Sequence, residues 1–247
     1  MGVPVIGCSC EVCRSSLPHN QRTRSGSLIT INDKKILIDA SQDFRDQALR
    51  FHLASIDAIF FTHAHYDHTA GIDDLRAYKK KLPCYMSRST YEDLKGRYGY
   101  IFEKRKKERK TLVSDFEISF LGEERGSVDI CAVSFNYMTY EQVGMPVNGF
   151  VLGNLGYVSD IKTYPTTIFE DLKGVEILIV SALRQAPSHI HFSIDEAIDF
   201  SRMVGAKKTY LTHLSHEIEH EKTQRSLPEN VFLAYDGLEV FFTVDDR

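Results

Sequence analysis

The sequence of 247 residues contains no apolar run close to the roughly 18 to 20 residues that cross a bilayer, so no membrane-spanning helix is expected. It also lacks an excess of charge of one sign, because 30 Lys and Arg stand against 34 Asp and Glu and leave a net charge of -4. A general attraction to nucleic acid or to an acidic membrane is therefore not supported, and either would need a local basic patch. With 43% apolar and 26% charged residues, the composition is typical of a globular protein.

No secretory signal is expected, because the amino-terminal residues carry no basic segment followed by an apolar stretch. Five cysteines, an odd number, together with that absence favour reduced thiols and a cytoplasmic location. Three of the five, Cys8, Cys10 and Cys13, lie within six residues, which indicates metal binding before disulfides. Cys84 and Cys131 show no matching partners and are expected in the core.

Strand and helix signals alternate along the chain, and no linker rich in Pro, Gly or Ser separates two halves. We therefore expect a single α/β domain over residues 1–247. A buried strand that leads into a polar cluster is expected at residues 55–62, and further strands are expected at 128–137, 149–159, 176–182, 207–212 and 231–242.

Two local signals are sharper than the rest. Residues 27–31 and 35–39 predict a β-hairpin, because Asn32-Asp33 between them is favourable turn chemistry. A capping box that begins at Ser193, with a glycine stop at Gly205, predicts a helix.

The motif His-Ala-His-Tyr-Asp-His at residues 63–68 directly follows the first of the predicted buried strands. Residues two apart face the same side of an extended backbone, so His63 and His65 can converge on one ion. Asp67 and His68, at the following turn, can reach a neighbouring position. Imidazole and carboxylate donors suit Zn²⁺, and also Mn²⁺ or Fe²⁺.

Asp160 and His213 follow two other predicted strands. Taken singly, each residue is more often a capping or loop residue than a ligand. Their recurrence at the carboxyl ends of strands makes both of them candidates to complete a metal shell.

These motifs resemble the ligand motifs of the metallo-β-lactamase superfamily, and within it the sequence is most similar to the PhnP-like family of cyclic phosphate phosphodiesterases. The likeness covers nearly the whole chain. It is carried further by residues 2–10, 39–45, 71–76, 182–184, 191–193 and 235–238. The resemblance implies an αββα sandwich, in which two mixed β-sheets pack face to face with helices outside.

The resemblance also implies two divalent metals, Zn²⁺ or Mn²⁺, at an active site. Their implied ligands come from separate parts of the chain: His63 and His65 for the first metal, Asp67, His68 and His213 for the second, and Asp160 as a bridge. Two such ions can activate a shared hydroxide and clamp a phosphodiester for in-line attack.

Two residues are implied as catalytic, Asp67 and His191. His191 lies in the phrase His-Phe-Ser and would act as the general acid, with His189 able to assist or substitute. In the alternative interpretation, His191 only precedes the helix cap at Ser193.

The three clustered cysteines predict a second kind of metal site. Cys8, Cys10 and Cys13 can wrap one Zn²⁺ and leave a fourth tetrahedral place, which the resemblance assigns to His216. Such a closed site would be structural. A redox-active or merely buried cysteine cluster is the alternative.

The sequence departs from the family in two places. Relatives contribute a further His to the first metal, but no His lies between His68 and His189, and an ungapped count places Gln142 there, or Asn136 with an insertion. An amide oxygen is a poorer Zn²⁺ ligand than imidazole, so the first site is expected to be weak, metal-selective or empty. Relatives also carry a strand ahead of residues 2–5, so either the start was assigned downstream of the true one, which we favour, or the sequence was trimmed, or the first strand is truly missing.

The leading hypothesis is a metal-dependent phosphodiesterase that cleaves a small cyclic or nucleotide-like phosphodiester. One alternative is a nuclease similar to tRNase Z, in which the basic segment at residues 103–110 contacts the nucleic-acid backbone. In the simpler interpretation, this segment is a solvated surface that binds no ligand. Others are a degenerate metal-binding scaffold and a thioester hydrolase, since the fold alone does not choose the substrate.

Overall fold

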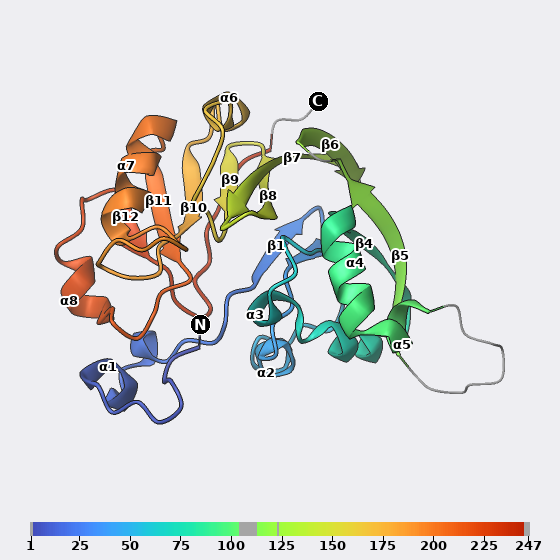
Figure 1. Cartoon of the computed structure of the whole chain (residues 1–247), viewed down its shortest axis with the longest axis horizontal. Coiled ribbons are helices and arrows are strands. Elements are labelled where there is room, and N and C mark those ends of the chain that lie inside the picture. Colours follow the sequence, from blue (N-terminus) through green and yellow to red (C-terminus); the bar gives the residue numbers. More distant parts are fainter. Residues whose placement is uncertain (1, 104–112, 123, 245–247) are drawn as a thin grey trace. The chain divides into compact units, whose positions relative to one another are not determined.

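The computed structural model describes residues 2–103, 113–122 and 124–244. The chain divides into two compact units, which we call the central unit (Arg24–Glu123) and the terminal unit (Met1–Thr23 with Glu124–Arg247). The fold is α/β as predicted, because each unit contains one mixed β-sheet with helices (Figure 1). The single domain over residues 1–247 stays a prediction.

The central unit is built on five strands: β1 (Ser27–Ile31), β2 (Lys34–Ile38), β3 (Ala58–Phe60), β4 (Lys81–Ser87) and β5 (Asp115–Leu121). They form one sheet in chain order, antiparallel between β1 and β2 and parallel thereafter. The predicted hairpin is confirmed, and its turn residues Asn32 and Asp33 have φ values of 48° and 59°, as a tight hairpin turn requires. The strand expected at 55–62 is confirmed as the shorter β3.

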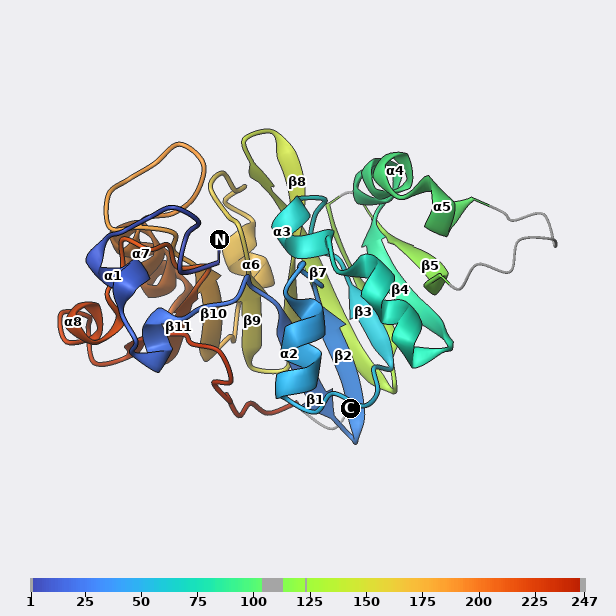
Figure 2. The ribbon, with the colours of Figure 1, turned by 90° about the horizontal axis from the view of Figure 1, so that it is seen from below.

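The helical segments of the central unit follow the strands in sequence. They are α2 (Phe44–Arg50), α3 (Tyr66–Thr69), the 3₁₀ segment η2 (Ile72–Tyr78), α4 (Arg88–Arg97) and α5 (Gly99–Phe102) (Figure 2). The core of this unit combines strand residues such as Ile59 and Met86 with Phe44, Ile72 and Leu94 from the helical segments. Cys84 belongs to this core as the sequence predicted, whereas the same prediction was wrong for Cys131, which is half-buried in a turn of the terminal unit.

The terminal unit contains seven strands: β6 (Arg125–Ile130), β7 (Val133–Gln142), β8 (Met145–Leu152), β9 (Leu155–Val158), β10 (Ile177–Ser181), β11 (Lys208–Thr212) and β12 (Val231–Leu233). The sheet order is β12-β11-β10-β9-β8-β7-β6. Strands β9 to β12 are parallel to one another, whereas β6 to β9 form an antiparallel meander.

Three strand predictions were wrong in extent. Residues 128–137 and 149–159 are not single strands, because each range contains a hairpin turn. Cys131 and Ala132 adopt positive φ in the first turn and Gly153 does so in the second. The third range, 231–242, is a strand only over Val231–Leu233. Strands β4 and β5 were not predicted.

Five helical segments belong to the terminal unit: α1 (Glu11–Arg14), the 3₁₀ segment η1 (Pro18–Asn20), α6 (Ile168–Asp171), α7 (Ile194–Val204) and α8 (His220–Gln224). The predicted helix is confirmed as α7, with a capping box between Ser193 and Glu196 and a left-handed Gly205 at its end. Its buried face contacts β10 and β11, so the cap fixes where this helix enters the core.

Two of the predictions from the sequence concern parts of the protein that the described residues do not include. Residues 104–112 are outside the described residues, and with them the cations of the predicted basic segment 103–110. The three alternatives for the strand that relatives carry ahead of residues 2–5 stay open. Within the part of the chain that the structure describes, no helix is long and apolar enough to cross a membrane.

The amino-terminal loop of the terminal unit packs on α8 through three rings. The His19 ring lies 4.2 Å from that of Tyr235 and 4.6 Å from that of His220, measured between ring centroids. His220 is buried, and this burial, reinforced by the charges of His19 and Arg22, lowers its pKa from 6.5 to about 4. The folded state therefore favours the neutral imidazole.

Because the folded-state pKa of His220 lies below its unfolded value, we expect the free energy of unfolding to fall as the pH drops from about 6.5 to about 4. The contribution of this one group is on the order of 2 kcal/mol. Urea unfolding at pH 7 and pH 5 measures it, and a His220→Gln variant should lose less stability over this interval than the unchanged protein. An equal loss in both proteins would contradict the assignment.

Candidate metal centres

The site residues of the central unit lie where two parallel strands end. Strands β2 and β3 pair with Ile38 opposite Phe60, so the residues that follow them emerge at the same sheet edge. Asp39 follows β2, and the segment that begins with Thr62 and His63 follows β3. Two polar segments distant in sequence are thereby adjacent.

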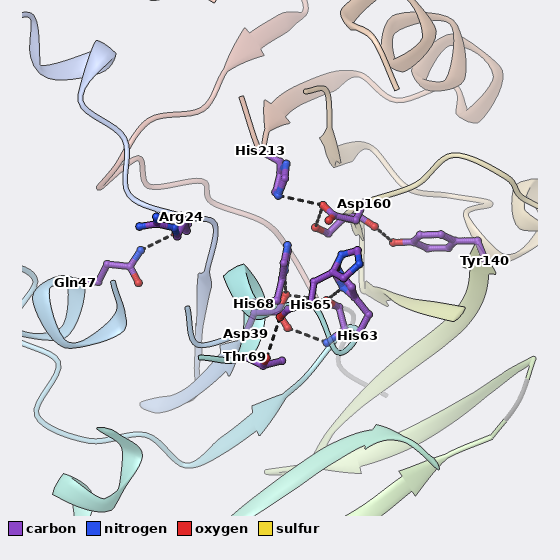
Figure 3. Close-up of polar contacts among 12 residues, drawn as sticks. Arg24, Asp39, Gln47, His63, His65, His68, Thr69, Tyr140, Asp160 and His213 are labelled. Carbon is purple, nitrogen blue, oxygen red and sulfur yellow. Dashed lines mark hydrogen bonds and ion pairs between the residues drawn. The ribbon is translucent and has the colours of Figure 1, made fainter. Parts of the chain in front are cut away.

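Three histidines gather at this edge (Figure 3). The His63 Nε2 and His65 Nδ1 atoms are 3.0 Å apart, and the rings of His63 and His68 lie 4.3 Å apart between centroids. Two imidazoles that bind one Zn²⁺ at about 2.05 Å hold their nitrogens roughly 2.9 to 3.4 Å apart. The spacing of His63 and His65 therefore fits a shared divalent ion, as the alternation argument predicted.

The Asp39 carboxylate orients two of these histidines. It accepts hydrogen bonds from the Thr62 amide (2.8 Å), the Thr62 hydroxyl (2.8 Å) and His68 Nδ1 (2.7 Å). The Thr62 hydroxyl donates to Asp39, so its oxygen accepts from His63 Nδ1 at 2.8 Å. Both rings therefore carry their proton on Nδ1 and keep Nε2 as the metal-binding atom, which is the usual role of outer-shell groups at metal sites.

Backbone contacts fix the loop that carries the motif. Helix α3 places Asp67 and His68 in a single turn, and the Thr69 hydroxyl donates to the His65 carbonyl at 2.9 Å. The Ala40 amide donates to the His68 carbonyl at 2.8 Å. Gly71 closes the arrangement, because a Cβ there would lie 2.2 Å from the Ser41 carbonyl oxygen.

The terminal unit holds a second cluster, made by Asp160, His191 and His213. All three are buried, and their candidate ligand atoms lie within 4.8 Å of one another. Asp160 Oδ1 and His213 Nε2 are 3.6 Å apart (Figure 3), and the rings of His191 and His213 stack at 5.1 Å. Asp160 and His213 follow the parallel strands β9 and β11, as predicted, so their sheet edge again carries the polar residues.

Gln142, the candidate for the weak first site, lies at the end of β7 and is buried. Its Nε2 atom is 3.0 Å from His191 Nδ1 and 2.9 Å from His191 Nε2. Among the described residues, its Oε1 atom has no hydrogen-bond partner. Asn136, the alternative candidate, lies on the exposed side of β7. Of the two amides, only Gln142 therefore contacts a predicted site residue.

The loop before α7 holds His191 in place. The Ser188 hydroxyl accepts from the His191 amide at 3.2 Å and donates to the His191 carbonyl at 3.0 Å. His189, by contrast, is exposed. Position therefore favours His191 over His189 as the residue that reaches the Asp160 and His213 side chains.

The predicted Cys₃His cluster is assembled in the terminal unit. The Sγ atoms of Cys8, Cys10 and Cys13 lie 3.2, 3.5 and 3.6 Å from His216 Nδ1. A tetrahedral Zn²⁺ with Zn–S of 2.3 Å and Zn–N near 2.05 Å would place sulfur and nitrogen about 3.5 Å apart. The four donors therefore fit a closed zinc site, and one of the thiols is already activated for it. The Cys13 amide donates to the Cys10 sulfur and, together with His216, lowers the pKa of Cys10 from 9.0 to about 6, which favours the thiolate that binds metal.

Comparisons with known proteins agree with this geometry. A family model described as beta-lactamase superfamily domain matches residues 34–214. The chain therefore belongs to the metallo-β-lactamase superfamily, as the motifs predicted. The αββα class is confirmed at the level of the fold by PqqB from Methylobacterium extorquens, which is 14% identical, with 98% of this chain and 96% of that chain covered and a TM-score of 0.77.

Within the superfamily, the chain is similar to a crystal structure described as a new diphosphatase from the PhnP family. The two are 34% identical with a TM-score of 0.90, and the match covers 99% of this chain and 94% of that chain. The octanoyltransferase of Porphyromonas gingivalis (strain ATCC BAA-308 / W83) is 34% identical over a match of 252 residues that covers 100% of this chain. Only 50% of that protein is covered, so the chain spans about half the length of this curated relative.

Because Asp39 fixes the ring protons of His63 and His68, we expect Asp39→Asn to weaken zinc binding at the histidine cluster by about 10- to 100-fold. Competition with a chromophoric chelator measures the affinity, and Asp46→Asn, on an exposed face of α2, is the matched control. Zinc at the Cys₃His cluster should stay bound. Unchanged affinity in a folded Asp39→Asn protein would show that the carboxylate has no such role.

Proposed function

We propose that the chain is a metal-dependent phosphohydrolase that cleaves a small phosphodiester. The observation that carries this proposal is the buried histidine cluster at the end of β3, whose nitrogens are spaced for a shared ion and whose ring protons are fixed by Asp39. The 34% identical PhnP-family diphosphatase supports the substrate class. Two divalent ions, Zn²⁺ or Mn²⁺, and one structural Zn²⁺ are the proposed complement.

The proposed ligands keep the roles implied by the family motifs. They are His63 and His65 for the first ion, Asp67, His68 and His213 for the second, Asp160 as the bridge, and Cys8, Cys10, Cys13 and His216 for the structural zinc. The donor sets support this division. Imidazole and carboxylate leave room for water and substrate oxygens, whereas three thiolates and one imidazole close a tetrahedral shell.

The chemistry of the substrate connects a phosphodiesterase with a diphosphatase. Each phosphorus of a disubstituted diphosphate carries two bridging oxygens, as the phosphorus of a phosphodiester does. One site can therefore act on both kinds of centre, since water that attacks in line, opposite one bridging oxygen, expels that oxygen with its substituent and leaves the other bridging oxygen attached to phosphorus. We propose a small cyclic phosphodiester or a disubstituted diphosphate as the substrate class.

Divalent ions at such a site would lower the pKa of water and neutralise charge that develops on the phosphoryl oxygens. The protein's own part is proton delivery and orientation. His191 is buried beside His213 and held by Gln142 and Ser188, which supports its proposed role as the group that donates a proton to the departing oxygen. Asp39 and Thr62 keep Nε2 of His63 and His68 available, so that the ligand shell is preorganised.

Asp67→Asn removes the charge of a proposed second-site ligand and should lower kcat for bis(p-nitrophenyl) phosphate by roughly 100-fold or more, because stabilisation worth several kcal/mol is lost. Steady-state kinetics with Mn²⁺- or Zn²⁺-loaded protein measure this, with metal counting by ICP-MS alongside. Asp46→Asn serves again as the exposed control. Unchanged turnover in the Asp67 variant would reject the mechanism.

The amide of Gln142 generates a further prediction. If it stands at the first metal site, Gln142→His should raise zinc affinity there about tenfold or more, because imidazole is the better Zn²⁺ donor. Gln142→Ala is the matched variant that removes the amide and adds no donor. Equal zinc affinities in all three proteins would place Gln142 outside the metal shell.

A second candidate function rests on the octanoyltransferase relative, half of which this chain matches. It is hydrolysis of an acyl thioester or ester, which the same kind of metal site can support. A panel of p-nitrophenyl phosphodiesters, a short-chain acyl ester and an acyl thioester discriminates the two. The nuclease alternative gains nothing from the described residues, because its basic segment lies outside them.

A further inference from the structure

Arg22 is a buried cation that joins two distant segments of the terminal unit. Its guanidinium donates from Nη1 to the Ser215 carbonyl at 3.0 Å and from Nη2 to the Ile218 carbonyl at 2.6 Å. Further bonds run from Nη2 to Asn20 Oδ1 (3.2 Å) and from Nε to the His19 carbonyl (2.9 Å). Each nitrogen of the guanidinium therefore donates a hydrogen bond, and the residue is 7% exposed.

Asn20 extends the same network. Its Nδ2 atom donates to Glu219 Oε1 at 2.8 Å, and its Oδ1 atom accepts from the His220 amide at 2.9 Å. The Arg22 backbone also pairs with Val3 in both directions, at 2.8 Å each. The segment that carries the three cysteines, between Val3 and Arg22, is thus tied to residues 215–220 at several points.

Residues 213–218, which we call the histidine turn, carry one proposed ligand of the active-site ions and one of the cysteine site. His213 begins the turn and lies 3.6 Å from Asp160, while His216 faces the three thiols. Ser215 lies between them, and its carbonyl is one of the two that Arg22 holds. On its other side the Ser215 amide donates to the Leu183 carbonyl at 2.8 Å. The turn is therefore fixed from both sides, and Arg22 contacts two of its backbone carbonyls through one side chain.

We propose that Arg22 is a positioning residue that fixes the histidine turn, so that His216 is presented to the cysteines and His213 to Asp160. The part that concerns His213 rests on the proposed function, whereas the part that concerns His216 does not. The geometry suits arginine in particular. Its planar fork can donate to two carbonyls at once, which a lysine ammonium with three rotating donors on one atom cannot reproduce with the same precision.

Cobalt provides the test, because the ligand-field and thiolate charge-transfer absorption of bound Co²⁺ reports the donor set and the tetrahedral geometry of the cysteine site. We expect Arg22→Gln to change this spectrum as His216 leaves the shell, and to raise the rate of zinc release to a chelator by about tenfold or more. Arg22→Lys should fall between Arg22→Gln and the unchanged protein. Arg225→Ala, an exposed position on the segment that follows α8, is the control and should match the unchanged protein.

A merely structural role would lower the melting temperature of Arg22→Gln and leave the cobalt spectrum and zinc release of the folded protein unchanged, which would overturn the proposal. If Arg22→Gln does not fold, Arg22→Lys decides by the same two readouts, and an unaltered spectrum there also overturns it. Phosphodiester hydrolysis is measured in parallel. If the unchanged protein proves inactive, the proposed function fails, while the cobalt arm still decides the role of Arg22 toward His216.

Discussion

The carboxylate of Asp39 accepts three hydrogen bonds in a place that water does not reach, and the histidine cluster of the central unit depends on it. A buried carboxylate is costly unless its oxygens are satisfied, and here the amide and hydroxyl of Thr62 and the ring of His68 satisfy them. The same bonds decide which nitrogen of each ring faces outward. The hydrogen bonds that stabilise the buried charge of Asp39 are therefore the same ones that orient the histidine ligands. If Thr62 or His68 moved away, the Asp39 carboxylate that both contact would lose a hydrogen-bond donor.

The sheet edges explain why such groups meet. Parallel neighbours end at the same edge, and Asp39, Asp160 and His213 each follow a strand of a parallel pair. All three adopt left-handed backbone conformations, with φ of 62°, 51° and 59°. This conformation costs a residue with a Cβ roughly 1 to 2 kcal/mol, so the surrounding structure must enforce it. Its recurrence at polar residues just beyond the strands indicates that the fold uses the turn to redirect these side chains at the sheet edge.

Neighbouring residues predicted the local parts of the site, the family motifs located distant candidates such as His216, and the roles of Asp39 and Arg22 were missed. The spacing of His63 and His65 is a property of extended backbone, and the cap at Ser193 and the turn at Asn32 are short-range, so each could be read from neighbouring letters. The roles of Asp39 and Arg22 depend on partners more than 20 and 190 positions away along the chain. The sequence indicates these two roles only through the placement of the residues, because Asp39 directly follows a strand and Arg22 lies in a polar loop. Gln142 is intermediate, since the family count located it but not its contact with His191.

The terminal unit holds one turn by two different means, and their chemistry is complementary. The cysteine cluster can bind its metal only when thiols are deprotonated, so its hold on His216 depends on pH, on metal supply and on the redox state of the sulfurs. Arg22 holds the neighbouring carbonyls through its guanidinium, which stays charged over the pH range in which the thiols lose their protons. The direct hydrogen bonds of Arg22 can therefore shape the turn before any metal binds. Because His216 is then already positioned, metal binding loses less conformational entropy in ordering the turn. Arg22 can therefore shape the turn first, and a metal ion held by the thiols and His216 would then secure a turn that already presents His213 to Asp160.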